Sequence, residues 1–134
     1  MRQLADHWAS NCNALAVVPK IQPPLEGGTD GDALPPEFDM KTRGADFKAW
    51  ATSEPMTFAT IAPKMQALIT HLTTECGIKK MSLVGFCWGY WCVVKMFGVP
   101  GLCDQVVSTA GPHPSVTLED GFFSGNSAEC AAKV

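Results

Sequence analysis

The stretch MSLVGFCWGYWC at residues 81–92 decides how the middle of this chain folds. Its first residues are mostly apolar, which is typical of a buried strand. Gly85 and Gly89 then enclose Cys87, and the apolar segment that follows, up to Gly98, is typical of a buried helix. The stretch therefore predicts a strand that turns sharply into a helix, with a cysteine at the turn.

The position of Cys87 is typical of a nucleophile elbow. In an elbow the nucleophile occupies a strained turn between strand and helix, so that its side chain projects above the sheet. Gly85 and Gly89, two residues to either side, are expected to leave room for that backbone. The helix N-terminus favours a thiolate, and the backbone N–H of Trp88 would be one oxyanion donor. We predict Cys87 as a nucleophile; the alternative is a strand-turn-helix corner around a buried structural cysteine.

Helices and strands are expected to alternate along the chain. Apolar residues at helical spacing predict two further helices, and Pro63 makes the second one either kink or begin near Ala62 rather than Ser53. This order is typical of an α/β fold, with a parallel sheet of about three strands flanked by helices in a single domain over 1–134. The expected elements are a helix at 2–12, a strand at 15–19, a long excursion loop at 20–52, a helix at 53–76, a strand at 81–86, a helix at 88–97, a strand at 104–111 and a tail at 116–134 with a short helix at its end.

Charge and cysteine usage exclude several classes of function. Ten Lys and Arg face thirteen Asp and Glu, a net charge of −3, and this argues against nucleic-acid or anionic-membrane partners. The N-terminus lacks the unbroken apolar stretch of a signal peptide, and no apolar run is long enough to span a membrane, so we expect a cytoplasmic protein. The six cysteines show no zinc spacing. We read them as reduced thiols, and we expect no metal and no cofactor.

The motif VGFCWG at 84–89 resembles the elbow of the dienelactone hydrolase family, α/β-hydrolases similar to carboxymethylenebutenolidase whose nucleophile is cysteine. LADHWASNCNALAVVP at 4–19 resembles a helix and strand of that family, and AGPHPS at 110–115 resembles a strand ending in its eukaryotic members. The resemblance covers about residues 2–118. It implies a partial α/β-hydrolase fold, a Cys-His-Asp triad with Cys87 as nucleophile, Trp88 as oxyanion donor, and a small-molecule lactone or activated ester as substrate. Tyr90 departs from the family, which often has a small residue there.

The triad acid and histidine of such an enzyme are not found after Cys87. In this fold they follow the nucleophile across two further strands, and the remaining chain is too short for them. His113 is the one histidine after Cys87, and its match to the family motif favours a structural role over that of a base. We therefore expect an incomplete domain, a fragment of a hydrolase that is inactive or very slow by itself. The alternatives are a non-catalytic α/β binding module or pseudoenzyme, and a thiol-redox protein using Cys87 and Cys92.

Overall fold

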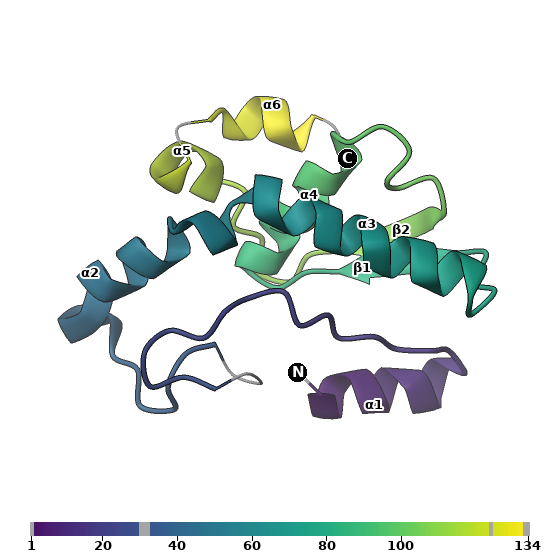
Figure 1. The fold of residues 1–134 in the computed structure, drawn as a ribbon, viewed down its shortest axis with the longest axis horizontal. Helices are drawn as coiled ribbons and strands as arrows, with labels where there is room; N and C mark the ends of the chain where they lie inside the picture. Colours follow the sequence, from purple (N-terminus) through teal and green to yellow (C-terminus); the bar gives the residue numbers. More distant parts are fainter. Residues whose placement is uncertain (1, 30–32, 124, 133–134) are drawn as a thin grey trace. The chain divides into compact units, whose positions relative to one another are not determined.

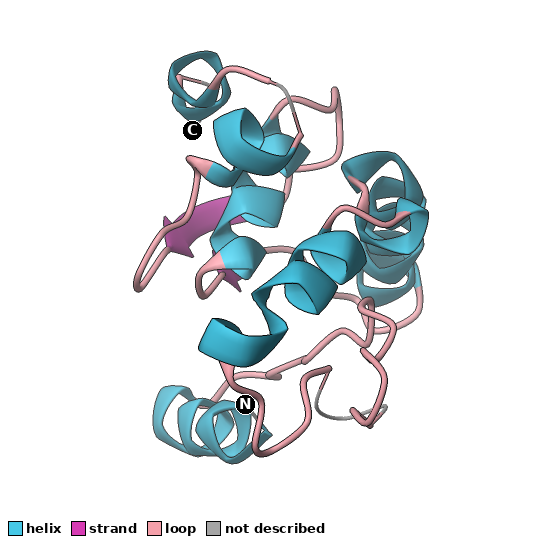
Figure 2. Ribbon diagram, turned by 90° about the vertical axis from the view of Figure 1, so that its left-hand side faces the viewer, coloured by secondary structure: helices cyan, strands magenta, loops and turns pink. Residues whose placement is uncertain are grey.

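The computed structural model describes residues 2–29, 33–123 and 125–132, and it divides into two compact units, Met1–Pro36 and Glu37–Val134. The first unit contains α1 (Arg2–Cys12), and the second contains all the other elements. Figure 1 traces these elements along the chain, and Figure 2 shows how far helices outweigh strands. The described residues therefore form a mixed helix-and-strand protein with a single small parallel sheet.

The first unit confirms the predicted N-terminal helix. Helix α1 covers the expected residues, and Ala5 on its apolar face is buried. Asn13 follows the helix with φ of +47°, a left-handed conformation that commonly ends a helix and that asparagine tolerates better than most residues. The backbone N–H of Ala14 donates to the carbonyl of Ala9, which closes the last turn.

The predicted strand at 15–19 is wrong, because these residues form no regular secondary structure. Leu15, Val17 and Val18 are 62%, 44% and 49% exposed. A β-branched run becomes a strand only when a neighbouring strand takes up its backbone hydrogen bonds. Among the described residues no strand pairs with this segment, so the sheet has two strands and not the expected three.

The predicted loop at 20–52 is irregular only over its described first part, because its second part forms α2 (Met40–Ala51). Asp39 caps this helix, accepting hydrogen bonds from the N–H of Lys41 at 2.9 Å and the hydroxyl of Thr42 at 3.2 Å. Such a capping bond satisfies a backbone donor that the first turn leaves free. Contacts of Phe47 with Phe38 and Trp50, with ring centroids 6.1 and 5.7 Å apart, stabilise the helix further. The many Pro, Gly and Asp residues before residue 40 are typical of a loop, and the sequence therefore did not predict this helix.

A short 3-10 turn, η1 (Glu54–Met56), precedes α3 (Phe58–Thr74). Ser53 lies at the N-cap position of η1 and Pro55 lies within this turn, but the Ser53 hydroxyl donates to the carbonyl of Trp50 and makes no capping bond. The prediction that Ser53 caps the long helix is therefore wrong, because α3 begins only after Thr57. Helix α3 begins at Phe58, so Pro63 lies inside it and the alternative start near Ala62 is wrong. Gly77 takes φ of +68° after the helix, where only glycine avoids a backbone penalty. The buried apolar core of the second unit comprises Ala51, Met56, Ile61, Met65, Ile69, Trp91, Cys92, Val93, Val94, Met96 and Leu102.

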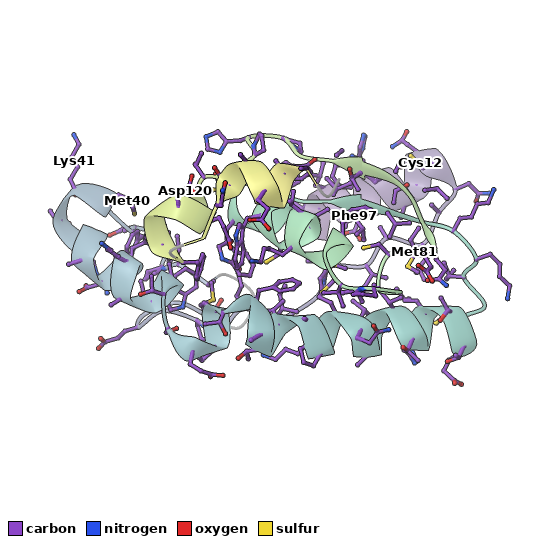
Figure 3. All side chains as sticks on the ribbon, turned by 90° about the horizontal axis from the view of Figure 1, so that it is seen from above. Cys12, Met40, Lys41, Met81, Phe97 and Asp120 are labelled. Atoms are coloured by element: carbon purple, nitrogen blue, oxygen red, sulfur yellow. The ribbon has the colours of Figure 1, made fainter. Side chains whose placement is uncertain are left out.

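The sheet of the second unit pairs β1 (Met81–Val84) with β2 (Val106–Ala110) in parallel. Both strands and the intervening α4 (Trp88–Phe97) lie where the sequence predicted them. Helix α4 contacts β1, α3 and the two C-terminal helices, and it therefore lies at the centre of the unit. Figure 3 labels Met81 at the start of β1 and Phe97 at the end of α4 toward the same end of the unit, as expected for a helix that runs back along its strand.

The predicted tail at 116–134 contains two short helices, α5 (Leu118–Phe122) and α6 (Ser127–Ala131), where we expected one. The carboxylate of Asp120, labelled in Figure 3, joins them. It accepts hydrogen bonds from the hydroxyl of Ser127 at 2.5 Å and from its backbone N–H at 2.8 Å. These bonds favour the charged form and lower the pKa of Asp120.

Candidate functional site

Cys87 occupies a strand-to-helix turn with a backbone conformation that is unfavourable for any residue with a side chain. It is the N-cap of α4, and its φ of +51° and ψ of −116° lie outside the left-handed helical well. Such a conformation costs of order 1–3 kcal/mol and persists only where the surrounding structure imposes it. The side chain is exposed, so the alternative of a buried structural cysteine does not describe Cys87.

Gly85 allows the close approach of α4 to the end of β1. A Cβ atom at Gly85 would lie 2.4 Å from the backbone nitrogen of Tyr90 and 2.5 Å from the carbonyl carbon of Gly89. These are backbone atoms, which cannot rotate away. At Gly89 a Cβ would meet nothing within 4 Å, so the prediction that this glycine also provides room is wrong. Of the two glycines beside Cys87, it is Gly85 that is sterically required, because it faces the backbone of the helix.

Trp88 is the first residue of α4, so its backbone N–H has no acceptor within the helix. An N–H in that position, directly after the cysteine, is what an oxyanion donor requires. The indole ring turns inward and lies 5.7 Å from the ring of Trp91. Its Nε1 is buried and lacks a hydrogen-bond partner among the described residues.

The segment after β2 runs beside the turn and continues the pairing of the two strands. The N–H of Gly85 donates to the carbonyl of Ala110 at 3.0 Å, and the N–H of Cys87 donates to the carbonyl of His113 at 3.1 Å. Cys87 and Pro114 form an isolated parallel bridge. His113 therefore contacts the turn through its main chain, which has φ of +55°, while the residue is exposed.

Ser115 is a residue of this turn that sequence reasoning did not single out. Its Oγ lies 3.2 Å from the Sγ of Cys87, within hydrogen-bonding distance. Among the described residues it is the hydrogen-bond partner of this sulfur. The sequence did place Ser115 at the end of the motif AGPHPS, but a serine hydroxyl in a loop has no spacing signal that assigns it to a cysteine 28 residues earlier.

Tyr90, which departs from the family motif, is accommodated by a glycine on the neighbouring strand end. A Cβ at Gly111 would lie 2.4 Å from the Cδ2 of Tyr90 and 2.5 Å from its Cγ. The ring therefore lies directly over the backbone of Gly111. The small residue needed for close packing at this corner is supplied by the strand end and not by the helix.

A buried carboxylate ties α4 to α5. Glu119, 7% exposed, accepts hydrogen bonds from the Nε1 of Trp91 at 2.6 Å and from the Nζ of Lys95 at 2.7 Å. Phe123 stacks on Trp91 with ring centroids 4.5 Å apart, and Phe58 meets the same ring edge-on. A buried charge is tolerated only with such partners. Trp91 lies four residues after Cys87, and its partner Glu119 lies four residues after Ser115, so the two contacts join the same pair of segments.

The cysteines with described side chains, all free, differ sharply in environment. Cys12, Cys76 and Cys87 are exposed, while Cys92 is buried in α4 and burial raises the pKa of its thiol well above the usual range. Desolvation, and then the nearby charge of Asp104, raise the pKa of Cys103. The described part of the chain holds no cluster of three potential metal ligands. No described helix is both long and apolar enough to cross a membrane.

No protein-family model, curated protein or solved structure matches this chain.

Proposed function

We propose that this chain carries a cysteine nucleophile of the dienelactone hydrolase type, with Cys87 attacking lactones or activated esters. One observation carries the proposal. Cys87 is exposed at the N-terminus of α4, directly after a parallel strand, in a strained backbone conformation with positive φ. A structural cysteine gains nothing from that conformation, whereas a nucleophile gains access to substrate and proximity to free backbone N–H groups.

The family and the partial α/β-hydrolase fold are part of the same proposal. They are supported by the parallel pairing of β1 with β2, the glycine required at position 85 and the continuation of pairing beyond both strands. The motifs at 84–89 and 110–115 come together at this corner, since Cys87 bridges to Pro114. The two motifs that resemble the family therefore lie next to each other, although they are far apart in the sequence.

The proposed chemistry begins with acyl transfer to sulfur. The Cys87 thiol loses its proton to solvent, and the thiolate attacks the carbonyl carbon of the ester. A tetrahedral oxyanion forms, and the backbone N–H of Trp88 is the donor placed to stabilise it. When the intermediate collapses, a thioester remains on Cys87 and the carbon–oxygen bond breaks, leaving its electron pair on an alkoxide or phenolate that takes a proton from solvent. In a lactone this oxygen stays attached to the acyl group.

Release of the acyl group from Cys87 is expected to be slow. Hydrolysis of the thioester needs a base that activates water. Among the described residues no imidazole or carboxylate is hydrogen-bonded to the sulfur of Cys87, whose partner is the hydroxyl of Ser115. The backbone N–H of Trp88 is the oxyanion donor that we assign, and such a donor contributes ~10²–10³ in rate. The chain should acylate once and turn over very little.

The test is mass spectrometry after exposure to p-nitrophenyl acetate. We expect one acetyl group on the peptide that carries Cys87, released as a single burst of p-nitrophenolate, and no adduct there in Cys87→Ala. Cys76→Ala is the matched control, because Cys76 is also exposed and free but lies at the end of α3. An acetyl group on Cys76 with none on Cys87 would refute the proposal and favour a non-catalytic binding module. Steady turnover that depends on Cys87 would mean that a base acts on it, and His113→Ala would then be the first variant to examine.

A further inference from the structure

The contact between Cys87 and Ser115 is held in place from both sides. Ser115 follows Pro114, which bridges to Cys87, and the carbonyl of Ser115 accepts a hydrogen bond from the N–H of Leu118 at 3.1 Å as α5 begins. Helix α5 is in turn fixed to α4 through the buried carboxylate of Glu119. The Ser115 hydroxyl and the Cys87 sulfur are therefore carried by two segments that are joined to each other on both sides of the contact. Only the rotations of the two side chains remain free to change the distance between these atoms.

A serine hydroxyl suits both protonation states of the sulfur. It accepts a hydrogen bond from a thiol, and by rotating about its C–O bond it donates one to a thiolate. Hydrogen bonds to a charged acceptor are about twice as strong as those between neutral groups. The hydroxyl 3.2 Å from Sγ therefore stabilises the charged nucleophile more than the neutral one, and it selects one rotamer of the cysteine.

We propose that Ser115 is the positioning residue of Cys87: its hydroxyl orients the sulfur and donates a hydrogen bond to the thiolate. The chemistry toward esters rests on the proposed function, but the action of Ser115 on the sulfur does not. Ser115 is not the nucleophile and needs no contact with substrate. Ser115 acts on the reaction by stabilising the thiolate form of Cys87 and by holding the sulfur in one orientation.

The test measures alkylation of Cys87 by iodoacetamide, resolved by peptide, from pH 6 to pH 10. Losing the charge-assisted hydrogen bond should make the thiolate less favourable, because hydrogen bonds to charged groups contribute more than those between neutral groups. A more basic thiolate is also a better nucleophile, which offsets about half of the resulting loss in rate on a logarithmic scale. Ser115→Ala should therefore react roughly threefold more slowly at pH 7, with a pH profile moved to higher pH, and should match or exceed the original rate near pH 10.

Three controls separate this role from general support of the fold. Ser115→Thr keeps the hydroxyl and should restore the rate to within about twofold. Ser108→Ala removes a comparable exposed hydroxyl, whose partner is Ser82 at 2.6 Å, and should leave Cys87 unchanged. The Cys76 peptide in each digest should react at a constant rate. Equal rates for Ser115→Ala and the original protein at every pH would overturn the proposal, and so would a loss that Ser115→Thr does not restore.

A second arm distinguishes failure of this inference from failure of the proposed function. Acetylation of Cys87 by p-nitrophenyl acetate at pH 7 should fall in Ser115→Ala by the same factor as alkylation. If acetylation alone fell, the hydroxyl would act on the oxyanion and the positioning role would be refuted. If Cys87 accepted no acetyl group while its alkylation still depended on Ser115, the ester chemistry would be refuted and the positioning role confirmed.

Discussion

Cys87 and Cys92 lie five residues apart, yet they occupy opposite environments. Cys87 is exposed at the turn, with a positive φ and a hydroxyl beside its sulfur. Cys92 is one turn into α4, 4% exposed, with regular helical backbone and a pKa raised by desolvation. The backbone conformation, and not the nearby sequence, therefore determines what each cysteine can do. The turn exposes one thiol at a helix N-terminus, and the helix buries the next among apolar side chains.

The two cysteines should differ most in their rate of reaction with iodoacetamide. In the folded protein at pH 8, Cys92 should react at least ~10³-fold more slowly than Cys87, because it reacts only after α4 opens from the core, at a cost of about 4 kcal/mol or more. Peptide-resolved mass spectrometry measures both rates in one sample. In 6 M guanidinium the two rates should agree within a few-fold. Comparable rates in the folded protein would remove the distinction between the two cysteines.

The two glycines around the turn should respond oppositely to the same substitution. Gly85→Ala forces a Cβ against the backbone of α4 and should destabilise the protein by about 3 kcal/mol, since the helix must move away from β1. Gly89→Ala meets nothing within 4 Å and adds a better helix former, so stability should stay the same or rise by up to about 1 kcal/mol. Urea unfolding of both variants provides the comparison. A similar loss at both positions would mean that the turn does not depend on Gly85 in particular.

Most of the second unit could be predicted from sequence because its signals are local. The run before Gly85, the apolar helix after it and the stop at Gly98 each act within a few residues, and β1 and α4 lie where they predicted. The strand at 15–19 was wrong because a strand depends on a distant partner, which no local pattern encodes. Helix α2 was missed because its capping residue, Asp39, follows many Pro, Gly and Asp residues that are typical of a loop.

The candidate site was predictable only in part, for the same reason. Cys87 was identified by its glycines and by the strand before it, all of them close in sequence. Ser115 and the main chain of His113 reach the site through the pairing of β2 with β1, which brings together residues 28 positions apart. The buried carboxylate of Glu119 gave no sequence signal, because an isolated glutamate in a polar tail is normally solvated.

Burial of Cys92 should make stability depend on alkaline pH. The folded protein retains the thiol proton, because burial raises its pKa, while the unfolded chain releases that proton above about pH 8.5. The contribution of Cys92 to the free energy of unfolding is fully present below that pH. It is lost as the pH rises further, by about 1.4 kcal/mol per pH unit. Between pH 8.5 and pH 10 the original protein should lose about 2 kcal/mol more than Cys92→Ala does. Urea unfolding at both pH values measures this, with Cys76→Ala as the control that keeps the full loss.

Substituting glycine and alanine at each of the two cysteines separates backbone strain from side-chain chemistry. At Cys87 the positive φ penalises any Cβ, so Cys87→Gly should be more stable than Cys87→Ala by about 1 kcal/mol. At Cys92 the backbone is helical, and glycine costs about 1 kcal/mol relative to alanine there, so the order should reverse. Comparing glycine with alanine at each position cancels the loss of the sulfur, which both substitutions share. Urea unfolding of the four variants at pH 7 measures the two differences. If alanine were the more stable residue at both positions, the turn at Cys87 would carry no strain, and the main structural argument for a nucleophile would be lost.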